Sequence, residues 1–288
     1  MGRTRNFYLQ LGFTLLVCAF LILPVFMSIV AGLTENFFVG LKSGFTLRWI
    51  GVVWGLYAPT IFRSMYIALA TLAVTLVLGV PTAYVLAKRP GLATRMIEEF
   101  LVLPVAIPGL AIALALIITY GGFRDFRTSW LFILVGHVLY TLPFMVRSVL
   151  AVLSIIDFRT LEESAASLGA GFWQRFFGIV VPNARSGIVA GSLTVVTLSI
   201  GEFNLTWMLH TPETMTLPVG LADSYASMRL EIGSAYTLVF FVMIVPLLIA
   251  LQRYGTPRGK PRARVQEEVR PTMPTVGQGP LGRGEKPA

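Results

Sequence analysis

The sequence predicts an all-α, polytopic membrane protein with six transmembrane helices, and three observations support this fold class. Only 13% of the 288 residues are charged, whereas soluble domains carry roughly a quarter. Hydrophobic residues make up 55% of the chain, and the mean hydropathy is +0.75. Six uncharged runs approach or exceed the roughly 20 residues that a helix needs to cross the hydrocarbon. The composition therefore excludes a water-soluble globule, and it excludes disorder, which requires low hydrophobicity.

The six runs define the expected helices in chain order. They cover residues 7–34, 64–87, 100–123, 128–146, 186–201 and 232–252. The first run is longer than the roughly 7–15 apolar residues of a secretory signal, and no A-x-A cleavage site follows it. We therefore expect an uncleaved first helix. The fourth run continues past Arg147 to Ile156, and the fifth is interrupted by Glu202 and resumes to Pro212.

Basic residues lie mainly on one side of these helices. With the N-terminus inside, 17 of the 23 Lys and Arg residues fall in inner segments. Because Lys and Arg concentrate on cytoplasmic loops, both termini are expected in the cytoplasm. The net charge of +9 is then explained by topology, and no nucleic-acid partner is expected.

The chain divides into two expected regions. Residues 1–252 form a transmembrane domain with its core at 60–250, and residues 253–288 form a basic tail. The tail contains six Pro and six Gly, and its basic residues outnumber its acidic ones by eight to three. Such a segment cannot bury a core, which predicts a disordered cytoplasmic tail. Contact with anionic membrane lipid is an alternative role for it.

The longest cytoplasmic loop, residues 154–185, separates the fourth and fifth runs. Thr160 and Glu163 have the spacing of a capping box, which predicts a short helix over residues 161–168. Gly169 then ends this helix. Aromatic residues follow at a spacing that predicts an apolar stripe on a second short helix. These residues are Phe172, Trp173, Phe176 and Phe177. We expect the first helix to lie across the inner face of the membrane, exposed to a cytoplasmic partner.

This loop resembles the EAA loop of the permease subunits of ABC importers. The family pattern is E-A-A, three residues, G, nine residues and I-x-L-P. The matching positions are Glu163, Ser164, Ala165, Gly169, Ile179 and Pro182. Ser164 replaces the middle alanine of the pattern, and Val181 replaces its leucine. The six expected helices, with this loop ahead of the fifth, agree with the same family over roughly residues 60–250.

The resemblance implies that the short helix docks into a cleft on a cytoplasmic ABC ATPase subunit. Glu163, Ala165 and Gly169 would then couple nucleotide-driven closure to the membrane helices. It also implies a second permease subunit, a periplasmic solute-binding protein and a location in the cell inner membrane. In the alternative interpretation, Glu163 only caps a helix and Gly169 only ends one, and both roles can hold together.

Three further stretches are similar to the spermidine/putrescine branch of this family. They are Gly44-Phe45-Thr46-Leu47 ahead of Trp49, Leu103-Pro104 and Pro108-Gly109. The resemblance therefore favours polyamines as the transported solutes. Importers of 2-aminoethylphosphonate and of ferric iron belong to the same branch and stay open as alternatives.

Polar and helix-breaking residues within the runs are candidates for the solute pathway. Glu202 lies about 17 residues into the fifth span, and ionisable residues at that depth are costly to bury. Asn204 and Tyr140 are further polar candidates. Pro104 and Pro108 remove backbone donors and predict a bend in the third span. A carboxylate facing a pathway suits a cationic or amine-bearing solute, whereas a hydrated Glu202 at the outer interface is the alternative.

Other classes of function lack the residues that they need. No G-x-x-x-x-G-K-[ST] loop occurs, so ATP hydrolysis is expected on a separate subunit and this chain is not expected to be an enzyme. One cysteine, Cys18, and two histidines, His137 and His210, leave little for a metal site, and no cofactor is expected. A membrane-embedded enzyme would depend on Glu202 and His137 without an H-E-x-x-H or G-x-S-x-G motif.

Overall fold

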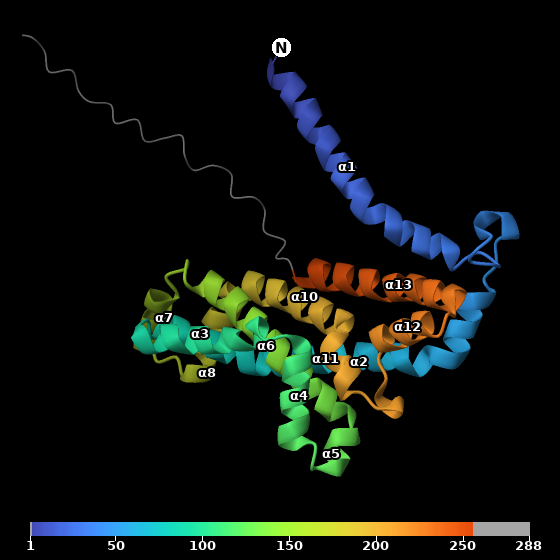
Figure 1. The fold of residues 1–288 in the computed structure, drawn as a ribbon. Helices are drawn as coiled ribbons and strands as arrows, with labels where there is room; N and C mark the ends of the chain where they lie inside the picture. Colours follow the sequence, from blue (N-terminus) through green and yellow to red (C-terminus); the bar gives the residue numbers. More distant parts are fainter. Residues whose placement is uncertain (1, 256–288) are drawn as a thin grey trace, which may run out of the picture. The chain divides into compact units, whose positions relative to one another are not determined.

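The computed structural model describes residues 2–255, and the predicted tail lies outside the described residues apart from its first three positions. All regular elements within residues 2–255 are helices (Figure 1). The β-type pairing in this range is an isolated antiparallel bridge between Thr34 and Phe45. The longer helices are α1 (Gly2–Ala31), α2 (Arg48–Lys88), α3 (Leu92–Ala106), α4 (Gly109–Tyr120), α6 (Trp130–Leu153), α7 (Phe158–Ser167), α10 (Arg185–Gly201), α12 (Leu217–Ala226) and α13 (Leu230–Gly255). The short elements are η1 (Gly40–Ser43), α5 (Arg124–Thr128), α8 (Phe172–Arg175), η2 (Phe176–Val180), α9 (Val181–Asn183), α11 (Asn204–Leu209) and η3 (Pro212–Thr214).

The described residues contain four helices that are long and apolar enough to cross a membrane, and two bent helix pairs that bring the number to the predicted six when each pair counts as one span. The long helices cover Asn6–Ala31, Arg48–Lys88, Trp130–Leu153 and Leu230–Arg253. The bent pairs are Leu92–Ala106 with Gly109–Tyr120 and Phe172–Asn183 with Arg185–Gly201, with angles of 100° and 71°. These lengths and compositions confirm an all-α polytopic membrane protein.

The second helix is much longer than the uncharged run that predicted it. It begins at Arg48 instead of residue 64, and its 41 residues span about 60 Å, roughly twice the hydrocarbon thickness. The uncharged run starts only after Arg63, but arginine is a good helix former, so the helix itself continues through it. The Arg63 guanidinium instead donates a hydrogen bond of 2.8 Å to the carbonyl of Met215.

The third and fifth spans are interrupted near the residues that the sequence marks as helix-breaking or charged, which are Pro108 and Glu202. The third bends at Ile107–Pro108, while Pro104 lies inside α3. This location confirms the predicted bend. The fifth bends by 71° at Ala184, and its second helix, α10, ends at Gly201, after which Glu202 is extended with φ −71° and ψ 120°. The chain then resumes helical geometry in α11.

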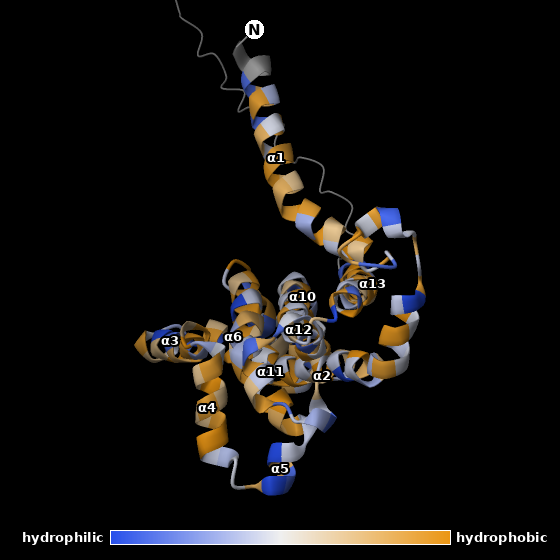
Figure 2. Ribbon diagram, turned by 45° about the vertical axis from the view of Figure 1, so that its right-hand side comes forward, coloured by the Kyte–Doolittle hydropathy of each residue, from blue (hydrophilic) through white to orange (hydrophobic). Residues whose placement is uncertain are grey.

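Helices α2, α6 and α10 pack together at the centre of the described residues (Figure 1). Glycine lets α10 approach α6 closely, because a Cβ on Gly187 would lie 2.5 Å from the Ser148 carbonyl oxygen. Such small residues are typical of helix contacts in membranes. Helix α13 packs on α10, α2, α12 and the end of α1. Figure 2 shows mostly hydrophobic residues along α1, whose apolar side chains are largely exposed, as expected of a surface that meets lipid or another subunit.

Candidate functional site

The predicted cytoplasmic helix is present as α7, but it begins earlier than the sequence indicated. Asp157 is its N-cap: the carboxylate accepts hydrogen bonds from the Thr160 backbone N–H at 3.4 Å and from the Thr160 hydroxyl at 2.7 Å. The predicted capping box of Thr160 and Glu163 is therefore wrong. The reason is that Asp157, a strong N-cap residue, starts the helix at Phe158 and leaves Thr160 inside it.

The end of α7 agrees with the prediction. Gly169 has φ +88°, a left-handed conformation that glycine adopts without strain. Its N–H donates to the Ala166 carbonyl at 2.9 Å, and the Ala170 N–H donates to the Ala165 carbonyl at 3.0 Å. These two hydrogen bonds satisfy carbonyls that the end of a helix leaves free. The chain consequently turns sharply at Gly169.

Helix α7 has two faces with different surroundings. Phe158 and Glu162, four residues apart on one side, are buried. Glu163, Ser164 and Gly169 are exposed, and Ala165 is half-buried. The positions that match the EAA pattern therefore lie mainly on the solvent-accessible side of the helix.

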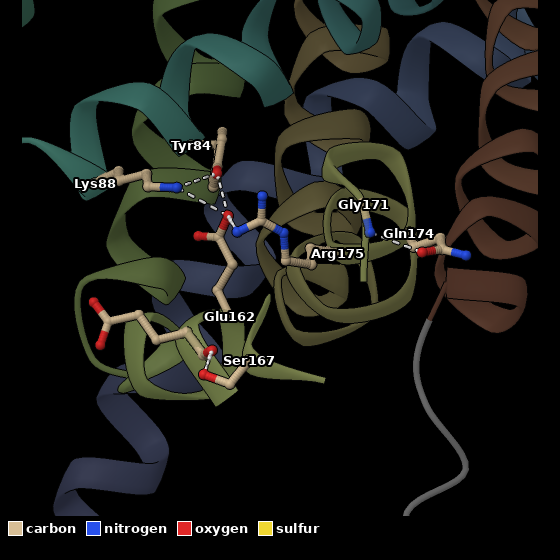
Figure 3. A network of polar contacts seen from close by, with 8 residues as sticks. Tyr84, Lys88, Glu162, Ser167, Gly171, Gln174 and Arg175 are labelled. Carbon is tan, nitrogen blue, oxygen red and sulfur yellow. Dashed lines mark hydrogen bonds and ion pairs between the residues drawn. The ribbon is translucent and has the colours of Figure 1, made fainter. Parts of the chain in front are cut away.

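Glu162, which the sequence analysis did not single out, forms the centre of a buried polar cluster (Figure 3). Its Oε1 accepts hydrogen bonds from the Tyr84 hydroxyl at 2.7 Å and from Lys88 Nζ at 2.9 Å. Nη1 of Arg175 lies 3.4 Å from the same oxygen. Burial by itself would raise the pKa of Glu162, but the hydrogen bonds from Lys88 and Tyr84 and the nearby positive charges lower it below its ordinary value. The carboxylate is therefore charged at neutral pH.

A hint of this burial exists in the sequence. Glu162 follows Phe158 by one helical turn, and its neighbour Glu163 points away by about 100° on the same helix. The aromatic Phe158 marks the face that packs against the protein, so the carboxylate on the same face is the buried one. Its partner Tyr84 is 78 residues away in the chain, which no local pattern reveals.

The second predicted short helix is only partly an apolar stripe. Residues 172–183 form α8, a π-helical turn over Phe176–Val180 and α9, instead of one regular helix. Phe176 is buried against Tyr84, whereas Trp173 and Phe177 are exposed and stack on each other with ring centroids 5.8 Å apart. The π-turn explains the difference, since it shifts the helical register within the aromatic run.

Two further EAA positions lie beyond this aromatic run. Ile179 is half-buried inside the π-turn, and Pro182 is exposed at the start of α9. The chain bends into the fifth span just after Pro182, between Asn183 and Arg185. The pattern therefore extends from the exposed face of α7 to the N-terminal end of α10.

Glu202 occupies the break between α10 and α11. Its Oε1 accepts the Leu205 backbone N–H at 3.0 Å. Its Oε2 accepts the Thr206 backbone N–H at 2.9 Å and the Thr206 hydroxyl at 3.1 Å. The half-buried carboxylate therefore caps α11, where a negative charge also suits the helix dipole.

The two interrupted spans meet at this carboxylate. Helix α11 packs on α4, and a Cβ placed on Gly109 would lie 3.5 Å from Glu202 Oε1 and 3.6 Å from the Asn204 Cβ. Pro108 is the exposed residue just before Gly109, so the bend of the third span places its second half against the break of the fifth.

The other two pathway candidates have different neighbours. Pro104 is half-buried and lines a cavity of about 290 Å³ with residues of α4 and Leu139. Tyr140 is half-buried, and its ring lies 6.1 Å from that of Phe144 between centroids. The structure thus brings Asn204 and the Pro108–Gly109 bend to Glu202, and it gives Pro104 and Tyr140 surroundings of their own.

A buried chain of polar side chains continues from Glu202 into the helix bundle. The Thr206 hydroxyl is 2.8 Å from His137 Nε2, and His137 Nδ1 is 2.8 Å from the Ser199 hydroxyl. Ser199 in turn lies 3.5 Å from the Thr71 hydroxyl. His137 is only 1% exposed, so both of its ring nitrogens are satisfied by hydroxyls instead of water. The chain joins α11, α6, α10 and α2.

This arrangement does not form a metal site, since no group of three or more His, Cys, Asp or Glu side chains within residues 2–255 could hold an ion. The protein is thus a multi-span membrane protein with one short helix, α7, that has an exposed face, two broken spans in contact and one carboxylate at their junction. Broken spans that meet inside a helical bundle are typical of membrane-transport proteins.

Sequence comparison identifies the family. Residues 79–257 match the binding-protein-dependent transport system inner membrane component family, and the chain belongs to it. It is an ABC importer permease located in the inner membrane. The matched region begins within α2 and contains α7, both broken spans and all of α13.

Several named relatives cover most of the chain. PhnV of Salmonella paratyphi A, provisionally named as a 2-aminoethylphosphonate transport system permease protein, is 25% identical over 250 residues, covering 86% of this chain and 94% of the relative. The molybdenum transport system permease protein ModB of Azotobacter vinelandii is 28% identical over 212 residues, covering 68% and 92%. ModB of Escherichia coli K12 is 24% identical over 209 residues, covering 67% and 91%. These relatives support the permease assignment, while the similarity to the spermidine/putrescine branch is not confirmed.

Proposed function

We propose that this permease forms half of a solute pathway together with a second permease subunit. ATP hydrolysis takes place on separate cytoplasmic ATPase subunits, and a periplasmic binding protein delivers the solute. Both termini lie in the cytoplasm in this arrangement, with residues 1–252 as the transmembrane domain and 253–288 as a basic cytoplasmic tail. The membership of the binding-protein-dependent family supports the need for these partners.

The docking site for the ATPase is the exposed face of α7. The observation that carries this proposal is the division of the helix into a buried face and an exposed face, with Glu163, Ser164 and Gly169 on the exposed one and Ala165 half-buried beside them. Asp157 and Gly169 fix both ends of α7, so it presents a rigid surface. Ile179 and Pro182 extend the motif to the root of α10, where a displacement of the loop reaches the fifth span.

Co-purification with a tagged cognate ATPase tests the docking site. We expect Glu163→Arg to abolish the association, because it reverses a charge on the exposed face without touching a buried contact. Gly169→Trp should have the same effect, because it adds bulk to the same face and strains a residue at φ +88°. Glu99→Gln is the matched control, since Glu99 is an exposed carboxylate on α3. Undiminished association of Glu163→Arg and Gly169→Trp would rule out α7 as the docking site.

We propose that the transported solute is a small molecule that carries an amino group. Glu202 supports this class, because it places a carboxylate at the junction of the two broken spans, beside Asn204 and Gly109. Polyamines and 2-aminoethylphosphonate both contain such a group, and the name of PhnV favours the second. Molybdate, suggested by the ModB relatives, and ferric iron lack an amine and are the competing solutes.

Uptake by cells that carry this permease with its partners separates these solutes. Labelled spermidine, 2-aminoethylphosphonate, molybdate and ferric iron are compared in cells with and without the permease. We expect uptake of one of the two amines, and we expect Glu202→Gln to lower it while co-purification with the ATPase persists. Uptake of molybdate or iron alone would refute the amine proposal, and normal amine uptake by Glu202→Gln would remove Glu202 from the pathway.

A further inference from the structure

The coupling helix α7 is joined to the membrane helices through a buried charge. Glu162 is 3% exposed, and it is the only acidic residue among the buried polar side chains of the described chain. Its partners come from two other elements: Tyr84 and Lys88 from the cytoplasmic end of α2, and Arg175 from α8. One carboxylate therefore connects three separate helices (Figure 3).

The surrounding contacts strengthen the link between α7 and α2. Phe158 packs on the Tyr84 ring with centroids 6.2 Å apart. The guanidinium of Arg159 donates a hydrogen bond of 2.7 Å to the carbonyl of Ala87, in the last turn of α2. Helix α7 thus contacts the end of α2 through an aromatic pair, a charge-assisted hydrogen bond and the Glu162 cluster.

A buried carboxylate does something here that an apolar side chain does not. Hydrophobic contacts are non-directional, so two helices joined by them alone can slide over each other at small cost. Charged hydrogen bonds are shorter and directional, and they fix the position of the groups that they join. Without the carboxylate, the exposed Lys88 and the half-buried Arg175 would both lose their counter-ion, and Nε of Arg175 is already buried without a partner in the described residues.

Helix α2 is well placed to carry a displacement from this point. It runs from Arg48 to Lys88 without interruption and packs on α6, α10, α12 and α13. Its contact with α10 includes the Thr71–Ser199 pair of the buried polar chain. A displacement of α2 at its Lys88 end would therefore act on the helices that pack on α2, which include α6 and α10 of the central bundle.

We propose that Glu162 is a positioning residue that locks α7 to the cytoplasmic end of α2, so that the two helices move as one rigid body when the ATPase subunits close. Glu163, its neighbour, faces the ATPase, whereas Glu162 faces the permease and transmits the movement. This inference rests on the proposed docking of the ATPase at α7.

Distance measurement between spin labels tests the rigid connection without any knowledge of the solute. Cysteines are introduced at Ser167 on α7 and at Arg89 at the end of α2, both exposed, after Cys18→Ser removes the native thiol. The full-length permease is assembled with its partner permease and ATPase, and the interspin distance is recorded with and without ATP. In the otherwise unchanged protein we expect one narrow distance that ATP does not alter.

Glu162→Gln should broaden this distribution and make its mean change with ATP, because the isosteric amide keeps the volume and loses the charge. Glu99→Gln, the same substitution on α3, should leave the distribution narrow. If Glu162→Gln does not assemble, Tyr84→Phe decides the question, since it removes a single hydroxyl donor and keeps the ring that packs on Phe158. We expect the same broadening to a smaller degree, and no further broadening when Tyr84→Phe is added to Glu162→Gln.

Three outcomes are distinguishable. A narrow distance that ignores ATP in both Glu162→Gln and Tyr84→Phe overturns the positioning role, even if the ATPase binds. Failure of the ATPase to bind the unaltered permease, seen in the co-purification before any label is introduced, would instead refute the docking of the ATPase at α7. A Glu162→Gln permease that binds the ATPase normally while its α7–α2 distance changes with ATP supports the inference.

Discussion

The Glu202 carboxylate caps α11 at the break of the fifth span, so its removal should lower the free energy of unfolding. Glu202→Ala deletes three hydrogen bonds, to the N–H groups of Leu205 and Thr206 and to the Thr206 hydroxyl. Leu205 and Thr206 are buried, so water does not easily replace the lost acceptor. At about 1 kcal/mol for each bond, the free energy of unfolding should fall by about 3 kcal/mol.

Glu202→Gln should cost less, about 1–2 kcal/mol, because one amide oxygen still accepts while the NH₂ group faces the Thr206 N–H. Denaturant unfolding of the purified permease in mild detergent, followed by tryptophan fluorescence, measures both variants. Asn204→Ala is the matched control: the side chain is exposed at the first position of α11, and its removal should change stability by less than about 0.5 kcal/mol. A Glu202→Ala variant as stable as Asn204→Ala would refute the capping role.

Three further predictions concern the remaining buried contacts. The folded-state pKa of Glu162 is lowered, so its contribution to stability is present above the ordinary value of 4.5 and is lost as pH falls through the lower folded value. Melting curves between pH 7 and 3 should show this loss of stability, and Glu162→Gln should make the stability depend less on pH. Gly187→Val forces a Cβ to within 2.5 Å of the Ser148 carbonyl oxygen, and since backbone cannot easily yield, unfolding in denaturant should show a loss of about 3 kcal/mol; Gly178→Ala, where nothing lies within 4 Å, should show no packing penalty of this kind. His137→Leu removes the partner of two buried hydroxyls and should cost about 2–4 kcal/mol in the same measurement, and a change below 1 kcal/mol would contradict the role of the polar chain.

Hydropathy along the chain predicts the spans well, because the length of an apolar run is a local property that the bilayer selects. It fails where a charge lies inside a helix. The uncharged run 64–87 starts after Arg63, yet α2 begins at Arg48 and includes both arginines, and Arg63 donates a hydrogen bond to the Met215 carbonyl 152 residues away. An uncharged run therefore shows where the apolar part of a helix lies and does not show where the helix begins, which explains the error at the second span.

The candidate site divides in the same way. The EAA pattern located the short helix α7 and its exposed face, because the spacing of a motif is visible in the sequence. The buried carboxylate beside Glu163 was missed, since two adjacent glutamates look alike until Tyr84 and Lys88 are brought to one of them. Glu202 was found by its depth in a span, but its engagement with Leu205 and Thr206 required the geometry of the break.

The short helix α11 shows why scarce charges in this chain have structural as well as functional consequences. Glu202 caps its first turn, and the Arg127 guanidinium donates a hydrogen bond of 2.7 Å to the Leu209 carbonyl at its last residue. An anion at the N-terminus and a cation at the C-terminus both interact favourably with the helix dipole. A six-residue helix is too short to be stable by itself, so these two charges and its packing on α4 and α6 are what hold it. Its two ends are held by different elements, α10 through Glu202 and α5 through Arg127, and the same Glu202 carboxylate lies beside Gly109 at the junction of the two broken spans.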